Sequence, residues 1–281
     1  MSVWFITGAS RGFGLELARQ ALAAGHQVVA TARDAASIKD QLPEGGDALL
    51  AVDLDVTDEA QAGQAVRAAV DAFGRIDVVV NNAGRGLLSA VEEASDKAAR
   101  SVYDVNVFGT LNVQRAVLPV LRAQRSGHLI NISSVGGLVG SPGWGLYNST
   151  KFAVEGFTEA LSKEVAPLGV HVTLVEPGYF RTDFLDGTSL HTEGSVIHDY
   201  DTTSGAMRRT ATQRNHEQPG DPVKAVAAIL RIAEEERPPL RLLLGSDAVT
   251  NVEAKVDQLR GDIDTWRELS LSTDHDDVRA G

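Results

Sequence analysis

The sequence contains no cysteine, and this absence limits the chemistry open to it. Disulfides, thiolate metal sites, iron–sulfur clusters and a cysteine nucleophile are excluded, while the redox compartment stays undecided. Basic residues are also scarce, since 26 lysines and arginines face 38 acidic residues and give a net charge of −12. A field of that sign repels nucleic acid and anionic membranes, so we expect neither as a partner.

Long hydrophobic runs are missing as well, and we expect no leader segment. No stretch approaches the roughly 20 apolar residues of a transmembrane helix, and the N-terminus lacks the basic and apolar regions of a signal peptide. We therefore expect a cytoplasmic protein. His191, His198 and His216 lack the spacing of a metal site, so we predict no metal.

The remaining composition, 43% hydrophobic and 23% charged, is that of an ordinary folded chain of 281 residues. Short β-branched runs alternate with helical patterns, and near-continuous Val, Ile and Leu runs are typical of strands buried on both faces of a parallel sheet. The predicted fold class is therefore α/β, a doubly wound parallel sheet of the Rossmann type. We expect strands at 3–7, 27–32, 49–53, 76–80, 128–133, 171–175 and 241–244, and helices at 14–24, 58–73, 100–124, 147–168, 222–236 and 249–269.

This alternation predicts a single domain over residues 1–271. Between about 184 and 220 the periodicity fails, and Thr, Ser, Gly, His and Asp are frequent. Because a loop this long in a compact domain is usually functional or disordered, we interpret it as a lid over a site. Residues 272–281 form an acidic tail that we expect to be flexible.

A glycine-rich turn follows the first expected strand and opens directly into a helix. Glycines there allow a tight bend and close approach of the backbone to a pyrophosphate, and the helix N-terminus offers N–H donors to an anion. We therefore predict a dinucleotide site. The residues assigned to this turn are Gly8, Ser10, Arg11, Gly12, Phe13 and Gly14.

The end of the second strand favours NADP(H) over NAD(H). The acidic residue that usually binds the ribose of NAD is absent there, and Arg33 stands beside Ala32. The guanidinium groups of Arg33 and Arg11 match a 2′-phosphate in charge and geometry, although either could be an ordinary solvated charge.

The ends of the next strands carry further candidate cofactor residues. Asp55 and Val56 could contact the adenine, or Asp55 or Thr57 could simply cap the following helix. The fourth strand closes with Asn82, Ala83 and Gly84, where glycine allows the backbone to pass close to the cofactor.

Tyr147 and Lys151 lie four residues apart, on one face of an expected helix. A neighbouring ammonium lowers the pKa of a phenol from about 10, which would give a tuned proton donor. Alone, such a pair is more often a half-buried tyrosine and a surface lysine. The context favours chemistry, because Ser134 follows the fifth strand and could donate to a substrate carbonyl at the carboxyl edge of the sheet.

In order and spacing, these motifs resemble the short-chain dehydrogenases/reductases over about residues 3–183. The resemblance implies hydride transfer between the nicotinamide and a carbonyl or alcohol carbon, with Tyr147 exchanging the proton on oxygen and Ser134 polarising that oxygen. Lys151 would hold the nicotinamide ribose and lower the pKa of Tyr147, while Asn106 would anchor a water in the proton relay. The residues implied at the carboxamide end are Pro177, Gly178 and Thr182.

The resemblance also implies a subgroup and an assembly. The segment 134–138 and the Ala32–Arg33 pair are most similar to NADP-linked hydroxysteroid dehydrogenases and carbonyl reductases. Members of the family often assemble through the helices expected at 100–124 and 147–168, so we expect a homodimer or homotetramer.

The substrate is expected beside Ser134 and Tyr147, in a mainly apolar pocket. Each candidate wall residue could equally belong to the core or to a subunit interface. Arg208, Arg209 and Arg214 could meet an acidic substrate, although a solvated basic run is the better explanation. The candidate walls are Leu138, Trp144, Leu146, Tyr179, Phe180 and Phe184.

The predicted function is NADPH-dependent reduction of a ketone or aldehyde, with Tyr147 as general acid/base. One alternative is the same machinery working oxidatively, as an NADP-linked alcohol or hydroxysteroid dehydrogenase. A second is a regulator that senses NADP(H) without chemistry, which the intact set of Ser134, Tyr147 and Lys151 argues against.

Overall fold

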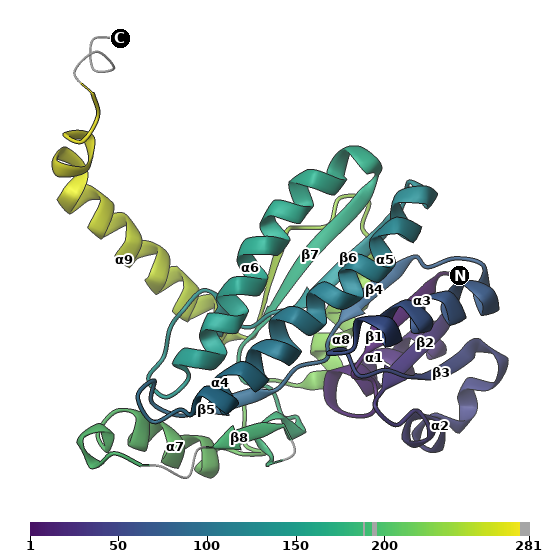
Figure 1. The fold of residues 1–281 in the computed structure, drawn as a ribbon, viewed down its shortest axis with the longest axis horizontal. Helices are drawn as coiled ribbons and strands as arrows, with labels where there is room; N and C mark the ends of the chain where they lie inside the picture. Colours follow the sequence, from purple (N-terminus) through teal and green to yellow (C-terminus); the bar gives the residue numbers. More distant parts are fainter. Residues whose placement is uncertain (188, 193–195, 276–281) are drawn as a thin grey trace.

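The computed structural model describes residues 1–187, 189–192 and 196–275, and within them seven parallel strands form a central sheet in the order β3-β2-β1-β4-β6-β7-β9 (Figure 1). The strand order reverses between β1 and β4, as in doubly wound folds. The predicted α/β fold of the Rossmann type is therefore confirmed. The strands are β1 Val3–Thr7, β2 Gln27–Ala32, β3 Leu49–Asp53, β4 Val78–Asn81, β6 Gly127–Ile132, β7 Val170–Pro177 and β9 Arg241–Leu244.

The central strands bury side chains on both faces of the sheet. In β1, Trp4 and Ile6 enter one hydrophobic core, whereas Val3 and Phe5 enter the other. Because successive side chains of a strand alternate between faces, a continuous apolar run requires helices on both sides. The first face is covered by α1 Gly12–Ala23 and α8 Pro222–Ala233, and the second by α3 Glu59–Phe73, α5 Thr110–Gln124 and α6 Gly145–Val165.

The single helix expected at 100–124 is divided. Helix α4 Asp96–Tyr103 is followed by a π-helical turn at Asp104–Gly109, and only then by α5. The apolar spacing of the sequence continues through this turn, so periodicity alone could not reveal it. Shorter elements are α2 Ala36–Gln41 and the 3₁₀ helices Pro43–Ala48, Val135–Gly137, Ala166–Leu168, Asp183–Leu185 and His198–Tyr200.

The segment 184–220 is more regular than its sequence predicts. Strand β8 Leu190–Thr192 pairs in parallel with β5 Gly86–Leu88, and helix α7 Ser204–Gln213 follows it. The expectation that regular structure is lost here is wrong, because pairing with a distant strand supplies order that local periodicity cannot show. Residues 188 and 193–195 of this segment lie outside the described residues.

A buried ion pair fastens this segment to the main body. The guanidinium of Arg208 on α7 binds the carboxylate of Glu93, whose oxygens also accept from the backbone N–H groups of Ala90 and Ile197, each at 2.9 Å. The hydrogen bond from Arg208 is the main cause that lowers the pKa of Glu93 to about 2. Arg208 is thus a structural contact, neither a solvated charge nor a substrate ligand.

The last helix, α9 Ser246–Leu271, is longer than the expected 249–269. Among its residues only Ala248 is fully buried, and the helix extends away from the rest of the molecule (Figure 1). The tail expected at 272–281 is described only as far as residue 275.

We predict that Arg208→Gln loosens the segment around α7 and lowers the free energy of unfolding by about 1–3 kcal/mol, because it leaves the Glu93 carboxylate buried without its charged partner. Faster hydrogen exchange at the amides of Ala90 and Ile197 would locate the effect.

The matched control is Arg209→Gln, since Arg209 is exposed and donates to a backbone carbonyl. The paired Glu93 stays charged down to about pH 2, whereas an unfolded glutamate protonates near pH 4.5. The stabilisation should therefore be complete above pH 4.5 and shrink towards pH 2. Equal losses in both variants would contradict the assignment.

Candidate active site

A cleft of about 740 Å³ opens at the carboxyl ends of the parallel strands. This is where ligands bind in open α/β sheets, and the volume lies in the range of small-molecule sites. The cleft collects residues from the β1–α1 turn, the ends of β2, β3, β4, β6 and β7, the start of α6 and the segment 184–220. The sheet therefore brings together most of the residues that the sequence assigned to a site.

The glycine turn adopts a backbone that requires glycine. Gly8 and Gly12 have φ angles of 65° and 54°, in the region that side chains disfavour. Gly14 does not line the cleft, and a Cβ there would overlap the carbonyl oxygen of Gly8, so its role is close packing. Ser10 and Phe13 both line the cleft. The turn and the N-terminus of α1 thus offer a backbone surface that fits a pyrophosphate.

Asn82, after β4, holds the glycine turn in place. Its Nδ2 donates to the carbonyl oxygens of Thr7 at 2.9 Å and Gly8 at 3.1 Å. The backbone N–H of Ala83 donates to the Thr7 hydroxyl at 3.0 Å. Ala83 and Gly84 continue along the cleft. The segment 82–84, which the sequence predicts as a cofactor contact, therefore also supports the glycine turn.

Arg11 and Arg33 line one end of the cleft together with Ala32. The nearby carboxylate of Asp53 is turned away, because it accepts from the backbone N–H of Ala35 at 2.7 Å. Asp34 likewise accepts from the backbone of its own turn. Within the described residues, neither Asp34 nor Asp53 lines the cleft, whereas both arginines do.

Asp55 and Val56 line the cleft beside that end. The Asp55 carboxylate accepts from the backbone N–H and the hydroxyl of Thr57, at 3.0 and 2.8 Å. The N-cap of α3 is Asp58, whose carboxylate accepts from two backbone N–H groups of the first turn. The alternative in which Asp55 or Thr57 caps this helix is therefore wrong.

Tyr147 and Lys151 lie one turn apart near the start of α6, and both are buried at the edge of the cleft. Lys151 Nζ donates to the carbonyl oxygen of Ile132 at 2.8 Å and lies 5.8 Å from the centre of the Tyr147 ring. Ser134 follows β6 and lines the same part of the cleft. Its Oγ accepts from the backbone N–H of Gly136 at 3.0 Å. The three residues therefore meet at one place.

Burial dominates the acid–base properties of this group. It raises the pKa of Tyr147 to about 12, and a hydrogen bond with Ser134 only partly opposes the rise. The expectation that Lys151 lowers the pKa of this phenol is therefore not met in this structure. Burial also lowers the pKa of Lys151 to about 8, against the opposing charge of Glu155. Tyr147 is thus a neutral phenol at pH 7, and Lys151 is largely protonated.

Asn106 lies in the π-helical turn and does not line the cleft. Its side-chain amide donates to the carbonyl oxygen of Arg85 and to the Thr150 hydroxyl, and its Oδ1 accepts from the N–H of Arg85 at 2.9 Å. These bonds tie the loop after β4 to α6. The water-binding role implied by the family resemblance stays a prediction.

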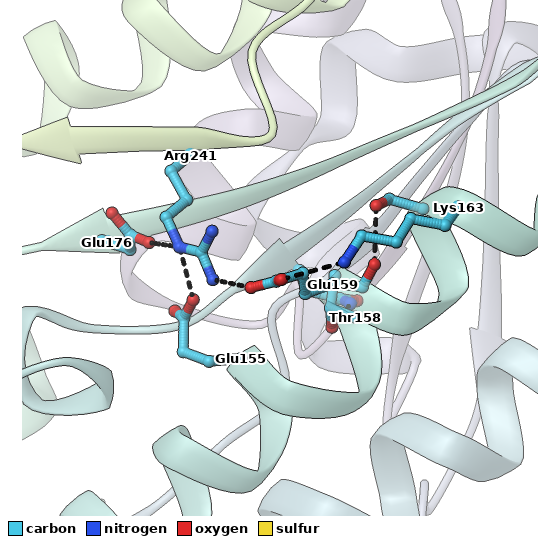
Figure 2. A network of polar contacts seen from close by, with 8 residues as sticks. Glu155, Thr158, Glu159, Lys163, Glu176 and Arg241 are labelled. Atoms are coloured by element: carbon cyan, nitrogen blue, oxygen red, sulfur yellow. Dashed lines mark hydrogen bonds and ion pairs between the residues drawn. The ribbon is translucent and has the colours of Figure 1, made fainter. Parts of the chain in front are cut away.

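A partly buried charge network joins α6, β7 and β9 (Figure 2). Arg241 of β9 contacts the carboxylates of Glu155, Glu159 and Glu176, at 3.2, 2.9 and 3.4 Å. Burial, followed by the charge of Glu155, raises the pKa of Glu176. Because Glu176 directly precedes Pro177, the network fixes the strand end from which Pro177 and Gly178 line the cleft.

Aromatic side chains form the apolar wall of the cleft. Trp144 packs edge-on to Tyr147 at 5.5 Å between ring centres, and Phe184 lies 5.6 Å from Tyr147. Tyr179 and Phe180 also line the cleft, as does Thr182. Leu138 and Leu146 are not among its lining residues. Leu146 instead packs on a small core formed by Leu87, Ala98 and Val102.

Several cleft residues escaped the sequence analysis. Gln218 is buried, and its side-chain Oε1 and Nε2 have no hydrogen-bond partner among the described residues. Asn251 reaches the cleft from α9, and Asp247 of the same helix accepts from the N–H of Tyr179 at 2.8 Å. No local motif marks these positions, because they lie far along the chain from the rest of the site.

Two further properties bear on the class of site. No helix in the described part of the chain combines the length and the apolar character needed to cross a membrane. In the same residues, His, Cys, Asp and Glu side chains do not gather in groups of three that could hold a metal ion.

Comparison with known proteins agrees with the geometry. A curated oxidoreductase named BOA17, from Botryotinia fuckeliana, is 41% identical over 96% of this chain and 98% of its own length. A 3-ketodihydrosphingosine reductase of Bacteroides thetaiotaomicron is 39% identical over 85% of this chain and 86% of its own. The crystal structure of a short-chain dehydrogenase from Streptomyces avermitilis superposes with a TM-score of 0.90 and 38% identity over 98% of both chains.

Solved neighbours at 26% identity include a short-chain dehydrogenase/reductase from Burkholderia phymatum in complex with NAD, with a TM-score of 0.83, and ElxO with NADP bound, with a TM-score of 0.73. The first is covered over 95% of its length and the second over all of it, with 93% and 89% of this chain aligned. Relatives of this fold thus bind either nicotinamide cofactor. A profile of the family described as short chain dehydrogenase matches residues 2–192. The chain belongs to the short-chain dehydrogenase family of oxidoreductases.

Proposed function

We propose that this protein is an NADPH-dependent reductase of ketones or aldehydes. The observation that carries the proposal is that Ser134, Tyr147 and Lys151 meet in the same cleft as the glycine turn before α1. When bound, the nicotinamide would supply the hydride. The side chains around it would bind the cofactor and control the proton and the substrate oxygen.

Tyr147 would donate the proton to that oxygen. A pKa raised to about 12 keeps the phenol protonated at neutral pH, so Tyr147 holds the proton that reduction requires. Working as an alcohol dehydrogenase would require a phenolate at the start, which burial disfavours. The net direction is set by the ratio of reduced to oxidised cofactor, so the reductive assignment rests on the choice of NADPH as cofactor.

Ser134 and Lys151 are placed to assist. The Ser134 hydroxyl accepts the N–H of Gly136 and hydrogen-bonds with Tyr147, and it would donate its hydrogen to the substrate oxygen when a carbonyl is bound between them. One N–H of the Lys151 ammonium donates to the carbonyl oxygen of Ile132. The two remaining N–H groups could donate to the ribose hydroxyls of the cofactor.

The preference for NADPH rests on the charges at the adenosine end of the cleft. Arg11 and Arg33 line it next to the small side chain of Ala32, and the carboxylate of Asp53 is engaged elsewhere. Guanidinium groups form strong paired hydrogen bonds with phosphate, which NADPH carries on its adenosine ribose and NADH does not.

The apolar wall formed by Trp144, Phe184 and Leu185 supports a mainly apolar substrate. The name of the Bacteroides relative, a keto reductase, agrees with a ketone. The proposal is tested by loss of NADPH absorbance at 340 nm against ketones, aldehydes, quinones and steroid ketones, with NADH in parallel. Turnover selective for NADPH supports it. Turnover with NADH alone, or cofactor binding without any turnover, contradicts it.

We predict that Tyr147→Phe lowers kcat at least a hundredfold while the Kd for NADPH changes little, because the variant keeps the ring and loses only the transferable proton. Single-turnover kinetics and fluorescence titration would separate the two effects. Tyr179→Phe is the matched control, since Tyr179 is partly buried and also lines the cleft. Full activity of Tyr147→Phe would remove this residue from the chemistry.

We predict that Arg33→Ala raises the Kd for NADPH about tenfold and leaves that for NADH nearly unchanged, since one charge-assisted contact to phosphate is worth about 1.5–3 kcal/mol. Calorimetric titration measures both constants. Arg19→Ala is a suitable control, because Arg19 pairs with Glu16 on the exposed side of α1. An equal rise in the Kd for NADPH and for NADH would show that Arg33 does not bind the 2′-phosphate.

We predict that kcat/KM for NADPH falls as the pH rises through about 8. The pKa of Lys151 is lowered to about 8, so its ammonium is present below that pH and lost above it. Tyr147 remains neutral over this range. In Lys151→Arg the fall should move to higher pH, although kcat is reduced. A profile that stays flat between pH 7 and 9.5 would exclude Lys151 as the titrating group.

A further inference from the structure

Helix α9 carries an apolar seam that its own chain does not cover. The apolar residues recur at alternating intervals of three and four, which is the spacing of a and d positions in a coiled coil. The a positions are β-branched. The seam consists of Val249, Val252, Val256, Leu259, Ile263 and Trp266.

The outer part of this seam faces solvent. Val256, Leu259, Ile263 and Trp266 are 52%, 48%, 58% and 59% exposed. Figure 1 shows the helix running away from the sheet and its covering helices. A continuous apolar stripe of this kind marks an interaction surface, because isolated exposed apolar residues do not fall into register.

We propose that α9 is an oligomerisation helix that pairs with α9 of a second copy of this chain, in antiparallel orientation. An amphipathic helix with a regular seam of period 3.5 is self-complementary, since the same stripe can pack on its own copy. The pair is centred between residues 257 and 258, so that Val256 packs on the partner's Leu259 and Ile263 on the partner's Val252.

The charges beside the seam select this orientation. In the antiparallel pair Lys255 lies opposite the partner's Asp262, and Glu253 lies opposite the partner's Arg260. The twofold axis repeats both contacts, which gives four attractive pairs. In a parallel pair Lys255 would instead face the partner's Arg260, a repulsive contact.

The charges also select the register. Sliding the helices by one heptad in one direction places Lys255 opposite the partner's Lys255, and sliding them in the other places Asp262 opposite the partner's Asp262. Like charges in these positions destabilise pairing. Only the register centred between residues 257 and 258 combines a continuous apolar seam with complementary charges.

This contact keeps the folded bodies of the two copies apart. In an antiparallel pair they lie at opposite ends of two helices, each of 26 residues and about 39 Å long. The surfaces of α5 and α6 are not used. The contact is therefore independent of any pairing through those helices, and the proposal does not depend on the identity of the substrate.

The test is sedimentation equilibrium of the full-length protein. We expect Leu259→Glu combined with Ile263→Glu to halve the mass of the assembly, because both charges fall on the seam. Gln258→Glu combined with Thr265→Glu adds the same charge on the exposed face of the helix and should leave the mass unchanged. An unchanged far-UV spectrum and melting temperature would show that each variant is folded.

A charge exchange tests the orientation. Lys255→Glu should weaken association at least tenfold, because glutamate then faces the partner's Asp262 on both sides of the pair. Adding Asp262→Lys should restore it. Tighter association of Lys255→Glu would overturn the antiparallel arrangement, and a wild-type mass equal to that of the seam variant would overturn the interface itself.

Discussion

The burial of the Lys151 ammonium is the constraint on which the rest of the site depends. Removing an ammonium from water costs several kcal/mol unless polar groups replace the solvent. Here the carbonyl oxygen of Ile132 accepts from Nζ, and Glu155, one turn further along α6, opposes the fall in pKa that burial causes. The cation in turn lies close to the Tyr147 ring. The start of α6 and the end of β6 are therefore held in one fixed arrangement.

Glu155 is itself buried and needs a partner, so the constraint extends to the edge of the sheet. Arg241 on β9 contacts both Glu155 and Glu176, which joins α6, β7 and β9 behind the cleft. These charges pair with one another, while Trp144 and Phe184 form an apolar wall of the cleft. The cleft can thus combine a buried cation with an apolar pocket.

The C-terminal helix α9 has two separate uses. Its first two turns support the site, because Asp247 accepts from the N–H of Tyr179 and Asn251 reaches the cleft. Beyond these turns the helix contributes almost nothing to the core of its own chain, and its apolar side chains keep coiled-coil spacing. If α9 pairs with a second copy, assembly would fix the helix whose base supports the cleft.

The sequence by itself determined the sheet, the glycine turn and the meeting of Ser134, Tyr147 and Lys151. These features depend on strand periodicity, on glycine geometry and on the rule that carboxyl ends of parallel strands share one edge. The tertiary structure decided what depends on distant contacts: the pairing of β8 with β5, the bond of Arg208 to Glu93, and the exclusion of Leu138 and Leu146 from the cleft. It also decided the pKa of Tyr147, because the cost of burying a phenolate depends on every group packed around it, whereas spacing along a helix reports only the nearest charge.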